Sequence, residues 1–365
     1  AVTLSLAYSM RRMLKTNNLV RKMHACETMG ATTVICTDKT GTLTQNRMSV
    51  EEACFYRGGE DCKSIVDANK ILLDSSDFSN EIKEGIAVNS TASLDLSNPA
   101  APSVLGNPTE GALLLWLHAK GVDYEALREE VKVVEELPFT TDRKYMATVV
   151  ESALMPGKRM LYVKGAPEIV YDLCASTDGV PLKAAVDAQL KLYQQRAMRT
   201  LGFACQEIGD EKVIVDGTIH VDKLRFLGIT AIADPVRNEV PESIGECLNA
   251  GICVKIVTGD TAETAKEIGR QVGLWTDKDT DRNIISGPEF AALTDAQLDA
   301  LVMDIKIIAR ARPMDKKRLV EALQRKNQVV AVTGDGTNDA PALKAAHVGL
   351  SMGDGTSVAK EASDM

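Results

Sequence analysis

The stretch that decides the fold is Thr32-Thr33-Val34-Ile35-Cys36-Thr37, which runs directly into Asp38-Lys39-Thr40-Gly41-Thr42-Leu43-Thr44. The first six residues are mostly β-branched or compact, and this composition predicts a buried strand. The next seven residues form a small polar loop, so the carboxylate of Asp38 is presented in a fixed position at the end of a strand. We therefore take Asp38 as the first candidate for chemistry.

Two later segments repeat this design of a strand that ends in an acidic loop. They are strand 251–257 with Thr258-Gly259-Asp260 and helix 262–272, and strand 328–332 with Thr333-Gly334-Asp335 and a helix from Ala340. Two more short strands are expected at 225–232 and 305–309. Strands that alternate with helices indicate a parallel, doubly wound α/β sheet, in which ligands bind beyond the carboxyl ends of the strands. The three acidic loops should therefore meet at one site.

The middle of the chain follows a different pattern. Expected strands of a mainly antiparallel sheet alternate there with helices: strands 131–137, 147–151 and 160–164, and helices 110–120, 167–174 and 182–200. This block lies inside the first fold, which is tolerated when the ends of an insertion lie close together. We predict an N-terminal segment over 1–28, a Rossmann-like domain formed by 29–53 and 223–365, and an inserted α+β domain over 54–222.

Composition excludes several classes of protein. The chain has 365 residues and a formal net charge of −9, which argues against a nucleic-acid binder held by phosphate contacts. The apolar stretch Ala1–Met10 is shorter than the roughly 20 residues that span a bilayer. No C-x-x-C pair occurs among the 8 cysteines, which fits a reduced compartment without a structural zinc site.

The acidic loops suit phosphoryl chemistry. Asp38 can attack phosphorus and form an acyl phosphate, but two anions then meet, so the site needs Mg²⁺ and cations. Asp38 and Asp335 offer hard oxygen ligands for Mg²⁺, and Lys316 offers a point charge. Hydroxyl and backbone donors that can cradle phosphate oxygens come from Thr258, Gly259 and Gly336.

The string DKTGTLT at 38–44 resembles the phosphorylation signature of the P-type cation-transporting ATPases, and the resemblance extends over nearly the whole chain. The catalytic domain of that family has a haloacid-dehalogenase-like fold of the Rossmann type. The resemblance implies that Asp38 is the phosphorylated nucleophile. It also implies that Mg²⁺ is held by the Asp38 side chain, the Thr40 backbone carbonyl and Asp335. The residues implied around the phosphoryl group are Lys316, Thr258, Gly259, Asp260, Asn338 and Asp339.

Thr40 separates this chain from phosphatases of the same fold, which carry a second Asp two positions after the nucleophile. A threonine cannot activate water by proton transfer at neutral pH. The acyl phosphate should therefore be hydrolysed more slowly than it forms.

The resemblance makes the inserted block a nucleotide-binding domain. The positions that match ATP-contacting residues of the family are Glu110, Phe139, Lys144, Lys164 and Arg199. An aromatic face for adenine and cations for phosphates are physically reasonable. Asp234 and Arg237 match a further family motif near the nucleotide and the hinge. No Walker A loop occurs, so the chain is not a P-loop ATPase.

Residues 1–21 look like the cytoplasmic exit of the fourth membrane helix of calcium-type pumps, with cations after an apolar segment. The chain lacks the His-Pro dipeptide that the heavy-metal branch of the family carries. We therefore expect Ca²⁺ as the transported ion, with Na⁺/K⁺ or H⁺ as less favoured alternatives. We expect the large loop on the cytoplasmic face of a pump, without its actuator domain and membrane helices. The alternatives are a phosphatase of the same fold with the insertion as its cap, and a non-catalytic nucleotide-binding module.

Overall fold

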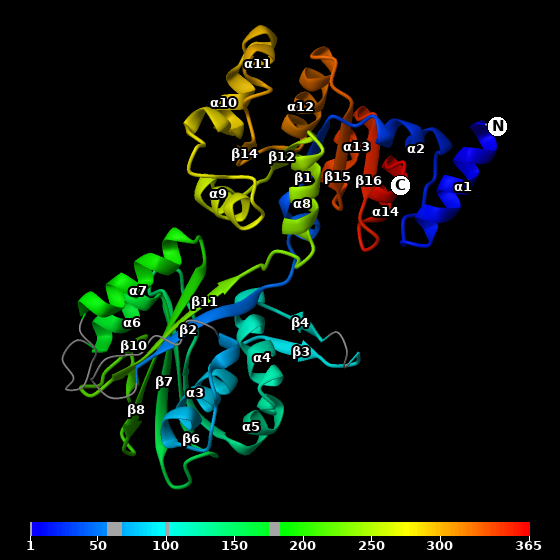
Figure 1. Cartoon of the computed structure of the whole chain (residues 1–365). Helices are drawn as coiled ribbons and strands as arrows, with labels where there is room; N and C mark the ends of the chain where they lie inside the picture. The colour runs from blue at the N-terminus through cyan, green and yellow to red at the C-terminus, as the bar shows by residue number, and fades with distance from the viewer. Residues whose placement is uncertain (1, 57–67, 99–101, 175–182) are drawn as a thin grey trace. The chain divides into compact units, whose positions relative to one another are not determined.

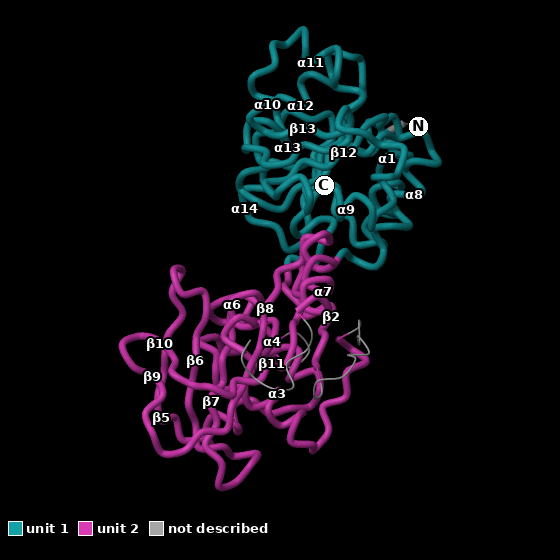
Figure 2. The backbone as a smooth tube through the Cα atoms, turned by 90° about the vertical axis from the view of Figure 1, so that its left-hand side faces the viewer, with its two compact units in different colours: residues 1–46, 236–365 teal, residues 47–235 magenta. Residues whose placement is uncertain are grey.

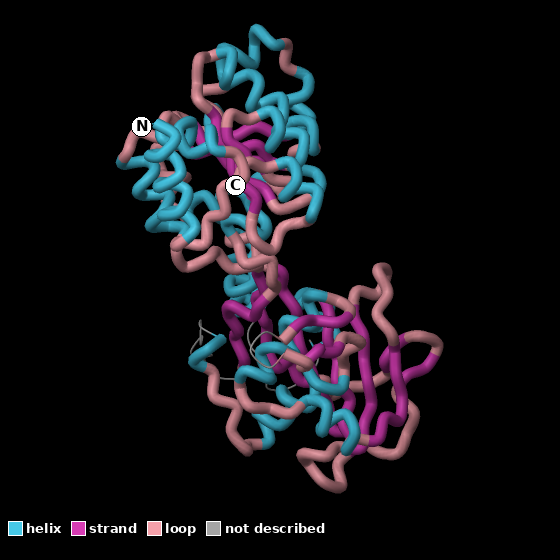
Figure 3. The backbone as a smooth tube through the Cα atoms, turned by 90° about the vertical axis from the view of Figure 1, so that its right-hand side faces the viewer, coloured by secondary structure: helices cyan, strands magenta, loops and turns pink. Residues whose placement is uncertain are grey.

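The computed structural model describes residues 2–56, 68–98, 102–174 and 183–365. The chain divides into two compact units (Figures 1 and 2): unit 1 comprises residues 1–46 and 236–365, and unit 2 comprises residues 47–235. Figure 3 shows strands with helices around them in each unit. Within the described residues, no helix has both the length and the apolar character that crossing a bilayer requires.

Unit 1 is built on a six-stranded sheet in which every pairing is parallel. In spatial order its strands are β13 (Ile284–Ser286), β14 (Ile307–Ala309), β12 (Cys253–Val257), β1 (Val34–Asp38), β15 (Val330–Gly334) and β16 (Val348–Ser351). Val34 and Cys36 of β1 are fully buried in the main core of this unit, while Ile35 faces a second cluster. Side chains on both faces of β1 are thus packed, as a parallel sheet requires.

Two helices of unit 1, α1 (Val2–Leu14) and α2 (Met23–Gly30), precede its first strand, and the others lie between or after its strands. The others are α8 (Val240–Asn249), α9 (Ala262–Gln271), α10 (Gly287–Ala292), α11 (Asp295–Leu301), α12 (Pro313–Arg325), α13 (Ala340–Ala345) and α14 (Ser357–Ala362). Single turns lie at η1 (Lys39–Leu43), η3 (Asp281–Asn283) and η4 (Thr337–Asp339). The side chain of Thr261 caps α9 by accepting from the Thr264 amide, which satisfies one of its free N–H groups.

Unit 2 is built on a six-stranded antiparallel sheet. Its spatial order is β2 (Ser49–Phe55), β11 (Arg225–Ala233), β8 (Arg199–Ile208), β7 (Arg159–Gly165), β6 (Tyr145–Glu151) and β5 (Lys132–Leu137). The remaining elements are η2 (Ala68–Lys70), α3 (Asp77–Val88), β3 (Ser93–Asp95), β4 (Ser103–Leu105), α4 (Pro108–Ala119), α5 (Tyr124–Glu130), α6 (Pro167–Cys174), α7 (Lys183–Gln195), β9 (Ile214–Val215) and β10 (Thr218–Ile219).

Two cores cover the faces of this antiparallel sheet. Leu113 and Leu117 of α4 pack with Tyr162 in one core, and Val170 of α6 packs with Leu161 in the other. Adjacent residues of β7 therefore enter opposite cores, as the period of two along a strand dictates. The predicted fold class, a parallel Rossmann-like sheet with an α+β insertion on an antiparallel sheet, is confirmed.

The expected edges of the inserted domain need correction. Strand β11 was expected in the parallel sheet, but it pairs antiparallel with β2, from Gly228 opposite Phe55 to Ala233 opposite Ser49. The junctions between the units therefore fall at 46/47 and 235/236, instead of 53/54 and 222/223. A second correction concerns Arg199, which begins β8, although we expected a helix to continue to Thr200. Residues 1–28, expected as a separate segment, belong to unit 1.

Candidate active site

Three neighbouring strands of unit 1 end at the same edge of the sheet, and their carboxyl ends carry the acidic loops. Asp38 is the last residue of β1, Thr258 follows β12, and Asp335 follows β15. They open into a cavity of about 370 Å³. Its lining includes Thr40, the predicted nucleophile Asp38 and the predicted metal ligand Asp335. It also includes the six residues expected around the phosphoryl group: Thr258, Gly259, Asp260, Lys316, Asn338 and Asp339. Asp38 and Asp339, which lie far apart in the sequence, thus share one site.

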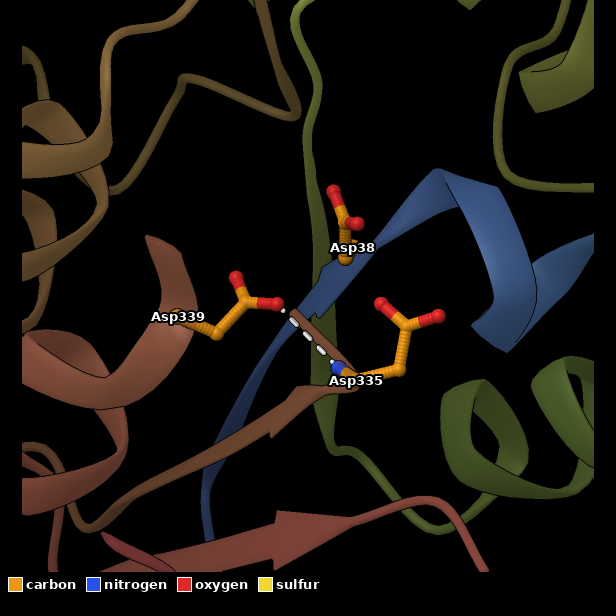
Figure 4. Close-up of side chains that lie close together, drawn as sticks. All are labelled: Asp38, Asp335 and Asp339. Atoms are coloured by element: carbon orange, nitrogen blue, oxygen red, sulfur yellow. Dashed lines mark hydrogen bonds between the residues drawn. The ribbon is translucent and has the colours of Figure 1, made fainter. Parts of the chain in front are cut away.

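Three carboxylates lie close together in this cavity (Figure 4). Each of Asp38, Asp335 and Asp339 offers a ligand oxygen, and these oxygens lie within 4.8 Å of one another. The Oδ2 atom of Asp339 accepts hydrogen bonds from the backbone N–H groups of Asp335 and Gly336, both at 3.1 Å. The Asp339 side chain therefore holds the loop that presents Asp335.

Two buried lysines neutralise two of the carboxylates around the cavity. The Nζ atom of Lys316 donates to Asp339 Oδ1 at 2.7 Å and to the Thr333 carbonyl at 2.8 Å. The Nζ atom of Lys39 lies 2.6 Å from Asp260 Oδ2. Among the described residues, neither Asp38 nor Asp335 forms an ion pair. These two carboxylates therefore keep their charge available for a ligand.

Sequence reasoning gave Lys39 no role. Its side chain is only 10% exposed, and it acts on the site by holding Asp260. A lysine next to a candidate nucleophile was a visible signal, but the direction of its side chain depends on the turn η1. In this turn Gly41 adopts φ +73°, which L-residues with a side chain rarely adopt.

The protonation of Asp38 and Asp335 reflects their crowding. Burial raises the pKa of Asp38 to about 6; the charge of Lys316 opposes this rise, and Asp339 adds to it. Burial also raises the pKa of Asp335, and Asp339 and Asp354 add to that rise. Both carboxylates are therefore costly to keep charged, and a bound cation would lower that cost.

The donor set fits a hard divalent cation. Mg²⁺ prefers carboxylate, carbonyl and water oxygens, and Asp38, Asp335 and the turn at Thr40 supply the protein share of such a set. Gly41 keeps the space beside Asp335 open, because a Cβ built on Gly41 would lie 1.9 Å from Asp335 Oδ2. Any side chain at position 41 would therefore displace a candidate metal ligand.

In unit 2, Glu110 and Lys164 form a buried ion pair. The Nζ atom of Lys164 donates to Glu110 Oε1 at 2.7 Å and to the Asn89 carbonyl at 2.6 Å. The Oε2 atom of Glu110 accepts from the backbone and hydroxyl of Thr91 and from the Ala92 amide. These two predicted nucleotide residues therefore lie together at the start of α4 and the end of β7.

The other predicted nucleotide residues are more exposed. Arg199 donates from Nη1 to Thr109 Oγ1 at 3.3 Å, so it lies beside the residue that precedes Glu110. Lys144 adopts φ +59°, and its carbonyl accepts from the Ala166 amide at 2.9 Å, two residues after Lys164. Phe139 is 53% exposed in the connection between β5 and β6. A large exposed aromatic ring is suitable for stacking on a base.

Asp234 and Arg237 belong to different units. Asp234 lies next to the junction at 235/236, where its Oδ1 accepts from the Arg47 amide at 3.1 Å. Arg237 belongs to unit 1 and donates from Nη2 to the Gly41 carbonyl at 2.8 Å and from Nε to the Thr44 carbonyl at 3.2 Å. Arg237 therefore holds the loop that follows Asp38.

Comparison with known proteins points to one family. The model of the P-type ATPase cytoplasmic domain N matches residues 77–239, and that of haloacid dehalogenase-like hydrolases matches residues 316–365. The chain is 41% identical to plasma membrane-type calcium-transporting ATPase 7 of Oryza sativa subsp. japonica, over 100% of the chain and 36% of that relative.

Relatives from two other organisms match the chain in a similar way. The chain is 40% identical to calcium-transporting ATPase PAT1 of Dictyostelium discoideum, and 37% identical to calcium-transporting ATPase 1 of Lactococcus lactis. Both matches cover 100% of the chain, but only 32% and 40% of the relatives, respectively. The chain thus spans about a third of the length of the curated relatives it matches. In its motifs, its fold and these matches, the chain is similar to the P-type ATPases.

Proposed function

We propose that unit 2 binds ATP and that Asp38 of unit 1 accepts the γ-phosphoryl group to form an aspartyl phosphate. The observation that carries this proposal is the group of three carboxylates at one sheet edge, of which Asp38 and Asp335 have no cationic partner among the described residues. A cavity with paired lysines around two unpaired carboxylates suits an anionic substrate that arrives with a divalent cation.

In the proposed step, one Asp38 carboxylate oxygen forms a bond to the γ-phosphorus. The bond from the γ-phosphorus to the oxygen that bridges it to the β-phosphorus breaks, and ADP leaves with the electron pair. The bound cation would offset the charge between the two anions. Thr258 and Gly259 line the cavity, where the hydroxyl of one and the backbone amide of the other could donate to phosphoryl oxygens, while Lys316 keeps Asp339 neutralised.

Thr40 supports a lasting intermediate over rapid hydrolysis. It lies in the turn that follows Asp38 and lines the cavity at the position where phosphatases of this fold carry a second acid. A hydroxyl group with an ordinary pKa does not take a proton from water at pH 7. The proposal therefore favours a pump over the phosphatase alternative.

In the intact protein, we propose that this reaction drives transport of Ca²⁺ and that both units lie on the cytoplasmic face of a membrane. Support comes from the relatives, whose names describe calcium-transporting ATPases. Ion ligands were not expected in this part of the protein, so the choice of ion rests on similarity alone.

Phosphorylation of Asp38 can be tested directly. The chain is incubated with Mg²⁺ and ATP that carries a radioactive γ-phosphate, then quenched in acid. We expect a label that survives acid, is released by hydroxylamine, and is absent in Asp38→Asn. ATP affinity should be the same in both proteins, because Asp38 lies outside unit 2. A label that persists in Asp38→Asn would contradict the assignment of the nucleophile.

The binding-module alternative is tested in a matched assay. Beryllofluoride with Mg²⁺ mimics a phosphoryl group on a carboxylate and needs no nucleotide. Its binding to the wild-type chain and not to Asp38→Asn would support the reactive site in unit 1 independently of unit 2. Retained ATP binding with neither label nor beryllofluoride binding would favour the binding module.

A further inference from the structure

Arg312 differs from the other cation of the cavity beside Asp38 in the place of its partner. Two cationic side chains, Lys316 and Arg312, belong to the described lining. The carboxylate paired with Lys316 is Asp339, which also lines the cavity. The carboxylate paired with Arg312 is Asp315, which is not among the described residues of the lining. The charge of Arg312 is therefore not cancelled by a carboxylate that lines the cavity.

Asp315 fixes the orientation of the Arg312 guanidinium. Arg312 donates from Nη2 to Asp315 Oδ1 at 3.0 Å and from Nε to Asp315 Oδ2 at 3.3 Å, and its backbone N–H donates to the same Oδ2 at 2.8 Å. The Asp315 side chain is only 4% exposed, so this anchor is buried. The Nη1 atom has no acceptor within the described part of the chain. One edge of the planar guanidinium is thus held in place, and the other edge is free to bind an anion.

Backbone hydrogen bonds hold the loop that carries Arg312 against the loop that follows β12. The Arg310 N–H donates to the Asp260 carbonyl at 2.7 Å, and the Ala311 N–H donates to the Thr258 carbonyl at 2.9 Å. Arg312 directly precedes α12, whose N-terminus carries a partial positive charge from the aligned peptide dipoles. Two sources of positive charge are therefore fixed beside Thr258 and Asp260.

Exposure to solvent separates Arg312 from Lys316. The side chain of Arg312 is 60% exposed, whereas that of Lys316 is 4% exposed. Lys316 is thus enclosed beside Asp339, and Arg312 lies at the outer edge of the cavity. In phosphoryl transfer the attacking and leaving oxygens lie roughly in line, so the leaving diphosphate points away from Asp38. The phosphates that are not transferred should therefore lie toward the outer edge, where Arg312 is.

We propose that Arg312 binds the β-phosphate of the incoming nucleotide, and of ADP after the transfer, at the outer edge of the cavity. This inference rests on the proposed function, because it needs a nucleotide whose γ-phosphorus reaches Asp38. Guanidinium and phosphate form charge-assisted and often bidentate hydrogen bonds. Lys316 is committed to Asp339, and a bound cation would be shared with the carboxylates. Arg312 therefore supplies positive charge for the phosphates that are not transferred.

The dependence of labelling on ATP concentration tests this contact on the whole chain. Rapid-quench labelling with γ-labelled ATP and Mg²⁺ gives the maximum rate and the ATP concentration at half of that rate. In Arg312→Gln this concentration should rise about tenfold, as expected for the loss of one hydrogen bond to a charged group, and the maximum rate should fall by a smaller factor. Arg312→Lys keeps the charge but not the bidentate geometry, and it should lie between the two. The ADP concentration that removes half of the label, by reversal of the transfer, should rise with the ATP concentration.

A second probe separates a phosphate contact from a role in holding the loop. Mg²⁺ with beryllofluoride occupies only the position of the transferred group, so Arg312→Gln should bind it with the affinity of the wild-type chain. Asp315→Asn keeps the Arg312 charge but weakens its anchor, and it should raise the half-saturating ATP concentration less than Arg312→Gln does. Arg325→Gln removes an arginine paired with Asp299 at the other end of α12, and it should change none of these quantities.

Each outcome decides for or against the contact. Equal half-saturating ATP concentrations in the wild-type chain and Arg312→Gln would overturn it. A loss of beryllofluoride binding in Arg312→Gln, or equal effects of Asp315→Asn and Arg312→Gln, would also overturn it, because Arg312 would then act by holding the loop. Absence of label from the wild-type chain would instead refute the proposed transfer, and the Arg312 contact with it.

Discussion

Two buried ion pairs, one in each unit, look almost identical and differ in their surroundings. Lys316–Asp339 in unit 1 and Lys164–Glu110 in unit 2 both have a nitrogen–oxygen distance of 2.7 Å. The lysine side chains are 4% and 3% exposed, and both carboxylates are 10% exposed. By distance and burial alone, the two ion pairs therefore cannot be told apart.

Their neighbours separate them. The second oxygen of Glu110 accepts from Thr91 and Ala92, and Lys164 also donates to Asn89, so this pair is satisfied by the fold. Beside Asp339 lie Asp38 and Asp335, which form no ion pair among the described residues and open into a cavity. A buried pair thus indicates chemistry when it stands next to unpaired charges, and structure when its partners are complete.

Removal of Lys164 should have the largest effect on stability. Lys164→Met leaves the Glu110 carboxylate buried without its cation, which should cost about 3–5 kcal/mol of the unfolding free energy of unit 2. The chain has two tryptophans, Trp116 in unit 2 and Trp275 in unit 1. Denaturant unfolding in a Trp275→Phe background, followed by Trp116 fluorescence, therefore reports on unit 2.

The double variant Glu110→Gln/Lys164→Met is the matched control. It removes both charges, so most of the lost stability should return, since replacement of both members of a buried pair is often nearly neutral. Equal instability of the single and double variants would show that the pair contributes through packing instead of charge.

Removal of Lys316 should mainly affect the reaction. Lys316→Met leaves Asp38, Asp335 and Asp339 all without a cationic partner among the described residues. Formation of the phosphorylated chain should therefore slow by about 10²–10³-fold, as for the loss of one stabilising donor in an active site. The rate is measured by rapid quench with labelled ATP. Lys317→Met, which removes a half-buried neighbour paired with Glu321, should leave the rate unchanged.

The comparison between the pairs sharpens when Asp339 is neutralised as well. Asp339→Asn/Lys316→Met should regain stability but not phosphorylation, because the cation itself is lost from the cavity edge. Recovery of the rate in this double variant would show that Lys316 acts only by neutralising Asp339.

The sequence predicted the residues of the site in unit 1 better than the boundaries of that unit. The convergence of Asp38, Asp260 and Asp335 follows from strand ends in a parallel sheet, which local patterns reveal. The apolar strand Arg225–Ala233 fits either sheet by its own sequence, and only its long-range pairing with Ser49–Phe55 decides between them. Local composition contains no information on that pairing.

The sequence also did not predict which side chains contact each other. The resemblance placed Glu110 and Lys164 near a nucleotide, but not in contact with each other, because 54 residues separate them in the chain. Arg237 was assigned to the nucleotide group by its motif, which did not indicate its hydrogen bonds to the carbonyls of Gly41 and Thr44. Such contacts depend on rotamers and on how loops from different elements meet, which a motif does not specify.

A change in pH should have a smaller effect on the stability of the units, and the direction of this effect differs between unit 1 and unit 2. For Glu110, burial favours a higher pKa, but the Lys164 charge and the hydrogen bonds from Lys164 and Thr91 outweigh it and hold the pKa below its ordinary value. The stability that Glu110 adds is thus present above the ordinary glutamate pKa. It is lost as the pH falls through the lower value of the folded chain.

Asp38 has the opposite sign, because burial raises its pKa to about 6 in the folded chain from an ordinary value of 3.8. The stability linked to its protonated form is present below 3.8 and is lost as the pH rises through 6. In metal-free buffer, acidification from about pH 7 to 5 should therefore stabilise unit 1 by about 1 kcal/mol and leave unit 2 unchanged. Unfolding followed by Trp275 in a Trp116→Phe background measures this gain. Asp38→Asn carries no charge at either pH and should lose most of it, and a full gain in that variant would place the titrating group elsewhere in the site.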